Sequence, residues 1–341
     1  MHTDLVSEIK IITNVDEIDK KKWDEFVFNH PLGSIYQTPH IYDIFKNTKN
    51  YQPIVIFSKN NNKISGVLLA VEINEGAGII SNFTSRSIII GGPLAIDNDE
   101  KILISLLSEY EKILSKKVIY TEIREIFELP FQSLLLKHGY QIEKRLNILV
   151  DLSKTEDELW YDMHPKRRND IKRAEKRGIT VKVIEEYDEI IESYEILKDV
   201  YKRAGLPLAD RSLFINCFSN LYKNGYCKFL GAYYNQDLIG TIVTLCYKDR
   251  VIDWYAGSNK ENQNKNPNDL LPWRAFIDAK NSGYKIFDFG GAGKPDVAYG
   301  VRDYKKKFGG SFIELNRYKK IHKPFLMSIG KLGLNFFQKL R

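Results

Sequence analysis

An internal repeat is the feature that most constrains how this chain folds. Residues 51–71 read as a strand, a polar Asn-rich turn and a second strand, and residues 226–245 show the same pattern. The second strand of each hairpin carries a glycine near its start, Gly66 in one and Gly240 in the other, 174 residues apart. This similarity predicts a hairpin-containing module that occurs twice.

Two further segments recur in nearly the same register. Residues 133–140 and 303–310 each look like a helix end closed by a glycine, and a strand follows each one. These glycines, Gly139 and Gly309, lie 170 residues apart. Each half also has a helical segment that leads to an apolar strand: 102–114 then 118–123, and 270–280 then 286–289. We therefore expect two copies of one α/β module.

The order of elements in the module resembles the GNAT acyltransferase fold, a mixed twisted sheet flanked by helices. Lys137-His138-Gly139-Tyr140 is similar to the usual GNAT step into the last strand. The fold class that we expect is α/β, with two tandem GNAT-like domains and a C-terminal helix. The expected boundaries are 1–151 for domain 1, 152–320 for domain 2 and 321–341 for the helix.

The C-terminal segment shows a helical pattern of its own. Apolar residues recur there at three- or four-residue spacing, and basic residues occupy some of the polar positions. The apolar positions are Phe325, Ile329, Leu332, Phe336 and Leu340. This basic amphipathic helix is expected to pack on domain 1, and contact with an anionic membrane surface is the alternative.

Positive charge is concentrated in two late segments. Residues 302–341 carry a net charge of +9 and residues 164–177 carry +5, so the rest of this +7 chain sums to −7. A segregated basic surface attracts the phosphates of nucleic acids, nucleotide-linked sugars or lipid headgroups. A solvated helix face is the alternative interpretation.

Composition excludes several classes of protein. Hydrophobic residues make up 43% and charged residues 28%, as in ordinary globular proteins. No apolar run approaches the ~18 residues of a membrane-spanning helix, and the first residues lack the pattern of a secretion signal. Three scattered cysteines and six scattered histidines suggest neither a disulfide framework nor a metal site. We expect a cytoplasmic protein, with the inner face of the membrane as a further location.

The second half contains the segments that are richest in chemistry. Residues 165–178 read as a short basic helix between Pro165 and Gly178. Residues 287–293 read as a buried strand that opens into a glycine loop, where a ligand can approach backbone N–H groups. The residues of the basic helix that we expect to bind phosphate or tRNA are Lys166, Arg168, Lys172 and Arg173.

Across residues 166–308 the chain resembles the Fem family (FemABX type), the aminoacyl-tRNA-dependent transferases that build peptidoglycan interpeptide bridges. Four features carry the resemblance in order: a Lys-x-Arg-x-x-Ile-(Lys/Arg)-x-Ala helix, a Tyr-Ala-Gly-Ser strand end, a Leu-Leu-x-Trp helix with Asp-Phe-Gly-Gly, and a Gly-x-x-x-(Phe/Tyr)-Lys-x-x-Phe motif. The first half is similar more loosely, through Gly33-Ser-Ile-Tyr-Gln-Thr38 and Gly92-Pro93. The coiled-coil insertion that some members use for tRNA has no counterpart here.

The resemblance implies an enzyme that transfers an aminoacyl group from aminoacyl-tRNA to an amine of a peptidoglycan precursor stem peptide. It implies no cofactor, with aminoacyl-tRNA as co-substrate, and a role in the cell wall and cell shape. The implied partners are a muropeptide or another amine acceptor and the tRNA, and the chain is expected to be a monomer. The C-terminal helix adds peripheral membrane contact as an option.

The resemblance also implies site residues. Lys305, in the closing motif, would be the catalytic cation beside the developing oxyanion. The sequence identifies no general base, since Asp288, Glu122 and Glu125 are each expected to be structural. The implied substrate-binding residues are Tyr255, Arg211, Lys46 and Arg302.

The main alternative is an acyl-CoA-dependent N- or O-acyltransferase of the same fold, acting on a cell-envelope or small-molecule acceptor. GNAT enzymes bind the CoA pyrophosphate with an (Arg/Gln)-x-x-Gly-x-(Gly/Ala) loop between a strand and the next helix. Residues 257–268 occupy this position and lack the glycine pair, which disfavours CoA. A non-catalytic phosphate- or RNA-binding module is a second alternative. The amino acid transferred, and whether the acceptor is soluble or lipid-linked, stay open on the sequence.

Overall fold

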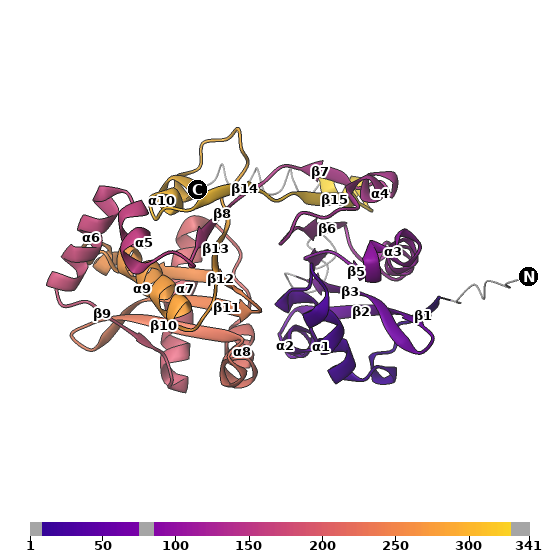
Figure 1. The fold of residues 1–341 in the computed structure, drawn as a ribbon, viewed down its shortest axis with the longest axis horizontal. Coiled ribbons are helices and arrows are strands. Elements are labelled where there is room, and N and C mark those ends of the chain that lie inside the picture. The colour runs from indigo at the N-terminus through magenta and orange to yellow at the C-terminus, as the bar shows by residue number, and fades with distance from the viewer. Residues whose placement is uncertain (1–8, 75–84, 329–341) are drawn as a thin grey trace, which may run out of the picture. The chain divides into compact units, whose positions relative to one another are not determined.

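The structure is a computed structural model that describes residues 9–74 and 85–328. The chain divides into two compact units, one formed by residues 1–144 with 315–341 and the other by residues 145–314. Each unit contains one mixed β-sheet with helices packed against it (Figure 1). The expected α/β class with two sheets is therefore confirmed.

The first unit is built on a sheet with the strand order β1-β2-β3-β4-β6-β15-β7, and β5 pairs with β3. Helix α3 begins where the Asp99 side chain caps the N–H groups of Lys101 and Ile102, and its apolar face lies in the core. The strands are β1 (Lys10–Ile12), β2 (Tyr51–Asn60), β3 (Lys63–Ile73), β4 (Arg86–Ile90), β5 (Leu94–Ala95), β6 (Tyr120–Arg124), β7 (Gln141–Glu143) and β15 (Arg317–Ile321). The helices are α1 (Lys20–Asn29), α2 (Pro39–Lys46), α3 (Glu100–Leu114) and α4 (Gln132–Lys137).

The second unit is built on a sheet with the order β14-β8-β13-β12-β11-β10-β9. The strands are β8 (Leu146–Asp151), β9 (Thr180–Val183), β10 (Cys227–Tyr234), β11 (Asp237–Tyr247), β12 (Arg250–Ser258), β13 (Ile286–Gly291) and β14 (Ser311–Glu314). The helices are α5 (Glu156–Asp162), α6 (Pro165–Lys176), α7 (Tyr187–Ala204), α8 (Arg211–Asn220), α9 (Pro267–Asn281) and α10 (Gly300–Lys306).

A cluster of phenylalanine rings fixes α9 and the end of α10 against β13. The ring of Phe276 lies 4.7 Å from that of Phe287 and 5.4 Å from that of Phe289, centre to centre. Phe308, just after α10, lies 5.4 Å from Phe289. All four side chains are fully buried, so the motifs on these elements are held by one apolar core.

The two halves repeat each other strand by strand. The series β1-β2-β3-β4-β6 and β9-β10-β11-β12-β13 each run through three antiparallel pairs to one parallel pair. The two hairpins also share a bulge, with Ser65 as the extra residue beside Gly66 and Ile239 as the extra residue beside Gly240. The duplication expected from the sequence is confirmed.

The units differ from the expected division by one strand at each boundary. Strand β8 lies within the expected domain 1 but pairs with β13 and β14 of the second sheet. Strand β15, except for its last residue, lies within the expected domain 2 but pairs with β6 and β7 of the first sheet. Each sheet is completed by a strand from the other half of the sequence. A short strand carries no signal of which sheet it joins, so this reciprocal exchange could not be read from the pattern.

The expected C-terminal helix is only partly within the described residues. Residues 317–321 form β15, and helical backbone begins at Pro324 and is described as far as Ser328. Ile329, Leu332, Phe336 and Leu340 lie outside the described residues. Within the part of the chain that the structure describes, no helix combines the length and the apolar character needed to cross a membrane.

Candidate functional site

The sheet of the second unit opens between two parallel strands. Strands β12 and β13 pair over only three residues, the last pair being Ile252 with Asp288. Their counterparts in the first unit, β4 and β6, pair over five residues. The opening leaves backbone groups of β12 and β13 accessible to neighbouring side chains, and it is specific to the second unit.

A bulge in β12 lies at this opening. Thr244 of β11 pairs with Asp253 and Val243 pairs with Tyr255, so Trp254 is the extra residue. A bulge bends the strand and redirects its side chains, and bulges of this kind are frequent beside active sites. The bulge therefore sets the directions of Asp253 and Tyr255, the residues that lead into the Tyr-Ala-Gly-Ser motif.

Lys305 reaches the opening from α10. Its Nζ donates hydrogen bonds to the carbonyl oxygens of Phe289, at 2.5 Å, and of Gly291, at 3.2 Å. Burial lowers the pKa of the Lys305 ammonium group, and the carboxylates of Asp253 and Asp288 oppose that shift. The ammonium group is thus held at the end of β13.

Asp288 organises the Asp-Phe-Gly-Gly turn that presents those carbonyls. Its carboxylate accepts hydrogen bonds from the Gly290 N–H at 2.7 Å, from Asn147 at 3.2 Å and from Arg250 at 3.0 Å. Gly290 has a φ of +68°, a left-handed conformation that favours glycine. These bonds agree with the structural role that we expected for Asp288.

The other two carboxylates considered from the sequence belong to the first unit. Glu122 forms ion pairs with Arg124 at 2.6 Å and with Arg317 at 3.4 Å. Glu125 accepts hydrogen bonds from the Tyr318 hydroxyl at 2.7 Å and from the Asn316 N–H at 2.5 Å. Both carboxylates join β15 to the rest of its sheet, which is a structural role.

Tyr255 belongs to an aromatic cluster between β12, α7 and α8. Its ring centre lies 4.9 Å from that of Phe214 and 5.7 Å from that of Tyr201. Gly257 permits this packing, because a β-carbon there would lie 2.7 Å from a methyl group of Val200 on α7. Arg211, the first residue of α8, is exposed one turn before Phe214.

Asp253 is a site residue that sequence reasoning missed. Burial raises its pKa to about 6, while Lys305 opposes that shift and Asp288 adds to it. The signal available in the sequence was an aspartate inside an apolar strand, two residues before Tyr255. A single acidic residue in a strand is too common to be singled out without knowledge of its burial.

Arg167 is a second residue that was missed, although it lies within the basic helix. Its side chain is buried, forms an ion pair with Asp269 of α9, and lies 4.6 Å from the ring centre of Tyr304 and 4.3 Å from that of Phe308. The Tyr304 hydroxyl donates a hydrogen bond to the carbonyl oxygen of Asn268 at 2.5 Å. These contacts fix α10, and with it Lys305, against α6 and α9.

Comparisons with known proteins agree with this fold. The GNAT acetyltransferase domain family matches residues 165–306. Lipid II:glycine glycyltransferase of Staphylococcus epidermidis, in two strains, is 25% identical over 228 residues, which are 61% of this chain and 53% of that protein. The crystal structure of FemX superposes with a TM-score of 0.71 and 16% identity, over 94% of this chain and 100% of that one. This chain has the GNAT fold and is similar to Fem-family proteins.

A tandem GNAT protein from the clavulanic acid biosynthesis pathway has the same fold, with a TM-score of 0.60 and 9% identity over 92% of this chain and 99% of that one. The two-domain architecture is therefore shared beyond the Fem family. The alignment with the glycyltransferases spans about half the length of those relatives.

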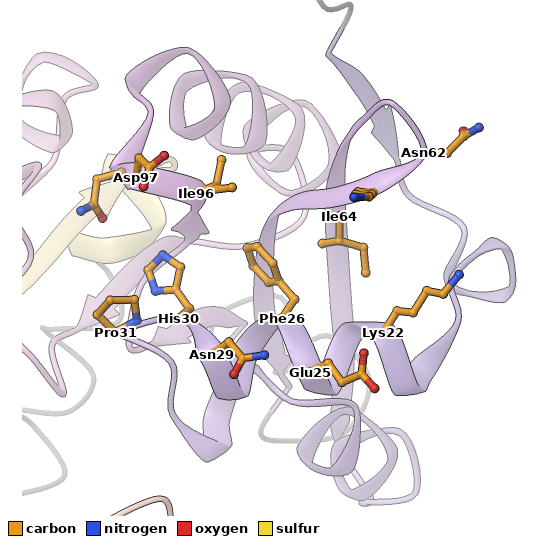
Figure 2. Close-up of a pocket in the computed structure, with 12 residues that line it drawn as sticks. Lys22, Glu25, Phe26, Asn29, His30, Pro31, Asn62, Ile64, Ile96 and Asp97 are labelled. Carbon is orange, nitrogen blue, oxygen red and sulfur yellow. The ribbon is translucent and has the colours of Figure 1, made fainter.

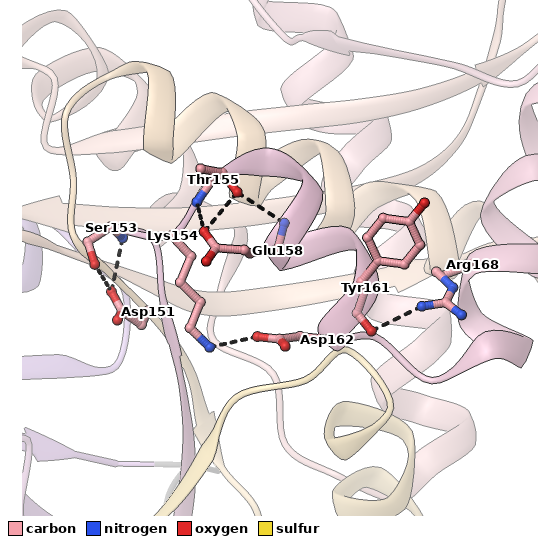
Figure 3. A network of polar contacts seen from close by, with 8 residues as sticks. All are labelled: Asp151, Ser153, Lys154, Thr155, Glu158, Tyr161, Asp162 and Arg168. Atoms are coloured by element: carbon pink, nitrogen blue, oxygen red, sulfur yellow. Dashed lines mark hydrogen bonds and ion pairs between the residues drawn. The ribbon is translucent and has the colours of Figure 1, made fainter.

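The basic helix α6 has one exposed and one buried side. Lys166, Lys172 and Arg173 are exposed, and Arg168 is half-buried and donates to the Tyr161 carbonyl oxygen at 3.0 Å (Figure 3). The Lys172 ammonium lies 5.6 Å from the Trp160 ring centre. Binding of phosphate or tRNA by these four residues stays a prediction.

A polar cavity of about 380 Å³ lies between α6, the start of α9 and the end of α10. Lys166 and Lys307 supply its positive charges, and the Arg167–Asp269 ion pair forms part of its wall. Tyr304 also lines it, so the cavity adjoins the helix that carries Lys305.

The other two implied substrate-binding residues, Arg302 and Lys46, lie outside the aromatic cluster around Tyr255. Arg302 uses its guanidinium group to hold the loop before α10, donating to the carbonyl oxygens of Lys294 at 2.6 Å and Val297 at 2.6 Å. Lys46 is the exposed last residue of α2 in the first unit. Substrate binding by either residue stays a prediction.

The first unit has a separate, larger cavity of about 710 Å³ beside α1, the β2–β3 turn and residues 96–98. Figure 2 shows Phe26 between Ile64 and Ile96, with Lys22 and Glu25 on the same helix. None of the site residues implied by the resemblance lines it. Among the described residues there is no group of three or more His, Cys, Asp or Glu that could hold a metal ion.

Proposed function

We propose that this protein is a transferase that forms an amide bond, moving an aminoacyl group from aminoacyl-tRNA to an amine of a peptidoglycan precursor stem peptide. The observation that carries the proposal is the Lys305 ammonium group at the opening between β12 and β13, where the carboxylates of Asp253 and Asp288 act on it. The similarity to a glycyltransferase named for lipid II supports a peptidoglycan precursor as acceptor.

The reaction is aminolysis of an ester, which is already an activated acyl group. Positioning of the two substrates and stabilisation of the developing oxyanion can supply most of the rate. An ammonium group has three N–H donors, and two of those on Lys305 are used by the carbonyls of Phe289 and Gly291. The third is available for the oxygen that becomes negative.

Acceptor binding is assigned to the aromatic and basic side chains around Tyr255. Tyr255 follows the bulge in β12 and packs its ring against Phe214, and Arg211 begins the helix α8 that carries Phe214. A muropeptide carries a pyrophosphate, for which a guanidinium group is a suitable partner. Lys46 and Arg302 complete the set proposed from the resemblance.

The start of α9 argues against CoA as the acyl donor. A GNAT pyrophosphate site uses free N–H groups at this helix start, but here Pro267 has none and the Asp269 N–H donates to the Asn266 carbonyl oxygen at 3.1 Å. Asp269 also places a carboxylate in the first turn, where it would repel phosphate.

The exposed side of α6 is proposed to meet the tRNA backbone. Lys166, Lys172 and Arg173 project from one helix, and Lys307 faces the same cavity as Lys166. Phosphate contacts of this kind give affinity without sequence readout. We place the reaction in the cytoplasm, where aminoacyl-tRNA is available, and it needs no cofactor.

The test is a calorimetric comparison of a UDP-linked muropeptide, CoA and an acyl-CoA at one fixed salt concentration. Wild type should bind the muropeptide and should not bind CoA. Arg211→Ala should lose muropeptide affinity by about tenfold or more, because a charge-assisted contact with the pyrophosphate is removed. Lys306→Ala, which removes a positive charge from an exposed residue of α10, is the control. Tight acyl-CoA binding by wild type would contradict the proposed donor.

A further inference from the structure

Asp253 occupies the opening in the second sheet. It is the last residue of β12 before the bulge at Trp254, where β12 and β13 no longer pair. A β-carbon on Gly290 would lie 3.6 Å from the Asp253 carbonyl oxygen, so the turn after β13 passes beside it. The ionisable groups that act on it from other elements are Lys305 and Tyr304 of α10, Asp288 of β13 and Tyr201 of α7.

The Asp253 carboxylate differs from its neighbours in having no bonded partner. No described residue donates a hydrogen bond to it or forms an ion pair with it. Asp288, by contrast, accepts from Gly290, Asn147 and Arg250. Asp253 is only half-buried, so its unpaired carboxylate is accessible to a substrate as well as to the field of Lys305, an arrangement typical of a reactive group.

We propose that Asp253 is a catalytic residue, the general base that takes a proton from the acceptor amine and returns it to the leaving ribose oxygen. The inference rests on the proposed function, because it needs an amine acceptor and an ester donor.

The proton transfers balance as follows. The acceptor enters as an ammonium ion, and Asp253 takes one N–H proton and becomes a carboxylic acid. The freed lone pair forms the C–N bond at the ester carbonyl, whose oxygen becomes negative beside Lys305. The C–O bond to the ribose then breaks, the ribose oxygen takes the proton from Asp253, and a second proton leaves the nitrogen for solvent. The products are an amide, a tRNA with a free hydroxyl group and one proton.

The ionisation of Asp253 suits this role. Burial raises its pKa to about 6, so it is ionised at neutral pH. A shift of about two pKa units means that it holds a proton roughly 100-fold more tightly than an ordinary aspartate. A base with a pKa nearer the working pH transfers protons more effectively.

The test compares Asp253→Asn with wild type in single-turnover transfer from pH 5 to 8.5. Wild-type rates should rise as pH passes through about 6 and then level off, because both the ammonium ion and the carboxylate are then present. Asp253→Asn should be slower by about 10²–10⁴-fold at pH 7 and should keep rising about tenfold per pH unit, since only amine that is already neutral reacts. Asp249→Asn, which changes an exposed aspartate in the turn before β12, should follow wild type.

Two further measurements separate a catalytic from a structural role. Acceptor affinity of Asp253→Asn, measured by calorimetry, should stay within about twofold of wild type. Acetate should partly restore transfer by Asp253→Ala, because it supplies the missing base. An Asp253→Asn rate within about threefold of wild type, or a wild-type profile with no bend near pH 6, would overturn the inference.

The same experiment distinguishes failure of the proposed function from failure of the proposed role of Asp253. Transfer by wild type from acyl-CoA and not from aminoacyl-tRNA would refute the donor, and the pH profile with acyl-CoA would still decide the role of Asp253. A wild type that is inactive with both donors would overturn the inference together with the function.

Discussion

The ionised Asp253 side chain is expected to lower the free energy of unfolding at neutral pH. Its pKa is raised from 3.8 to about 6 in the folded protein, so folding is favoured while the group is protonated, below about pH 4. That contribution is lost as pH rises through about 6, and above this pH the buried carboxylate costs up to about 3 kcal/mol. Asp253→Asn should therefore raise the free energy of unfolding at pH 7.5 and leave it nearly unchanged at pH 4. Chemical denaturation at both pH values measures this, and equal stability of the two proteins at pH 7.5 would contradict it.

Arg167 is expected to contribute to the stability of the fold, whereas the exposed basic residues of the same helix are not. Arg167→Ala should lower the free energy of unfolding by about 3–5 kcal/mol, because it leaves the Asp269 carboxylate buried without its partner. Arg173→Ala, an exposed residue of the same helix, should change stability by no more than about 0.5 kcal/mol. Replacing both members of the pair, as Arg167→Met with Asp269→Leu, should recover most of the loss. Equal effects of Arg167→Ala and Arg173→Ala would refute this assignment.

Single residues were predictable where a motif surrounds them. Lys305 and Tyr255 lie in motifs that the family resemblance marks, and their roles in the site stay predictions. Asp253 and Arg167 could not be predicted, because the first is one acid in a strand and the second is one cation among many. Their importance comes from burial, which is a property of the tertiary structure.

At the scale of elements, α6 has a buried side and an exposed side with different residues. Its buried side, with Arg167, Ile171 and Ala174, anchors it, and its exposed side carries the cations proposed to meet tRNA. Replacing the exposed basic side chains should therefore leave the fold intact.

The triple variant Lys166→Ala, Lys172→Ala, Arg173→Ala should weaken tRNA binding. The slope of log affinity against log salt should become shallower by about 0.7–0.9 for each phosphate contact removed, with the free energy of unfolding nearly unchanged. The control replaces Lys21, Lys101 and Lys116, exposed residues of the first unit, so that net charge falls by the same amount. An unchanged salt dependence in the α6 variant would mean that tRNA binds elsewhere.

Elements with their own local signals were predicted well. The two hairpins, α3, α9 and β13 appear where the pattern placed them, because turn chemistry and hydrophobic periodicity are local. Strands β8 and β15 were placed in the wrong halves, since the choice of sheet depends on pairing with residues far away in the sequence.

At the scale of the whole molecule, β8 and β15 each complete the sheet formed by the other half of the sequence. Strand β15 lies between β6 and β7, and its Tyr318 is almost fully buried. The first sheet therefore depends on residues that follow the entire second unit. Substitutions in β15 should therefore change the stability of the first unit.

Tyr318→Ala should lower the free energy of unfolding of the first unit by about 3–5 kcal/mol, because a large buried side chain and its bond to Glu125 are lost. Hydrogen exchange should show the loss in β6 and β7, with β12 and β13 protected as in wild type. Tyr161→Ala, at a tyrosine that is 70% exposed, is the control. Loss of protection throughout both sheets would show that the units unfold as one.

The most direct test of the proposed function is a single-turnover assay with aminoacyl-tRNA and a UDP-linked muropeptide, with the amide product followed by mass spectrometry. Wild type should form the aminoacylated muropeptide, and Lys305→Ala should be slower by about 10²–10³-fold, because the cation beside the oxyanion is lost. Lys306→Ala should resemble wild type. Formation of an acylated product from acyl-CoA, with none from aminoacyl-tRNA, would contradict the account.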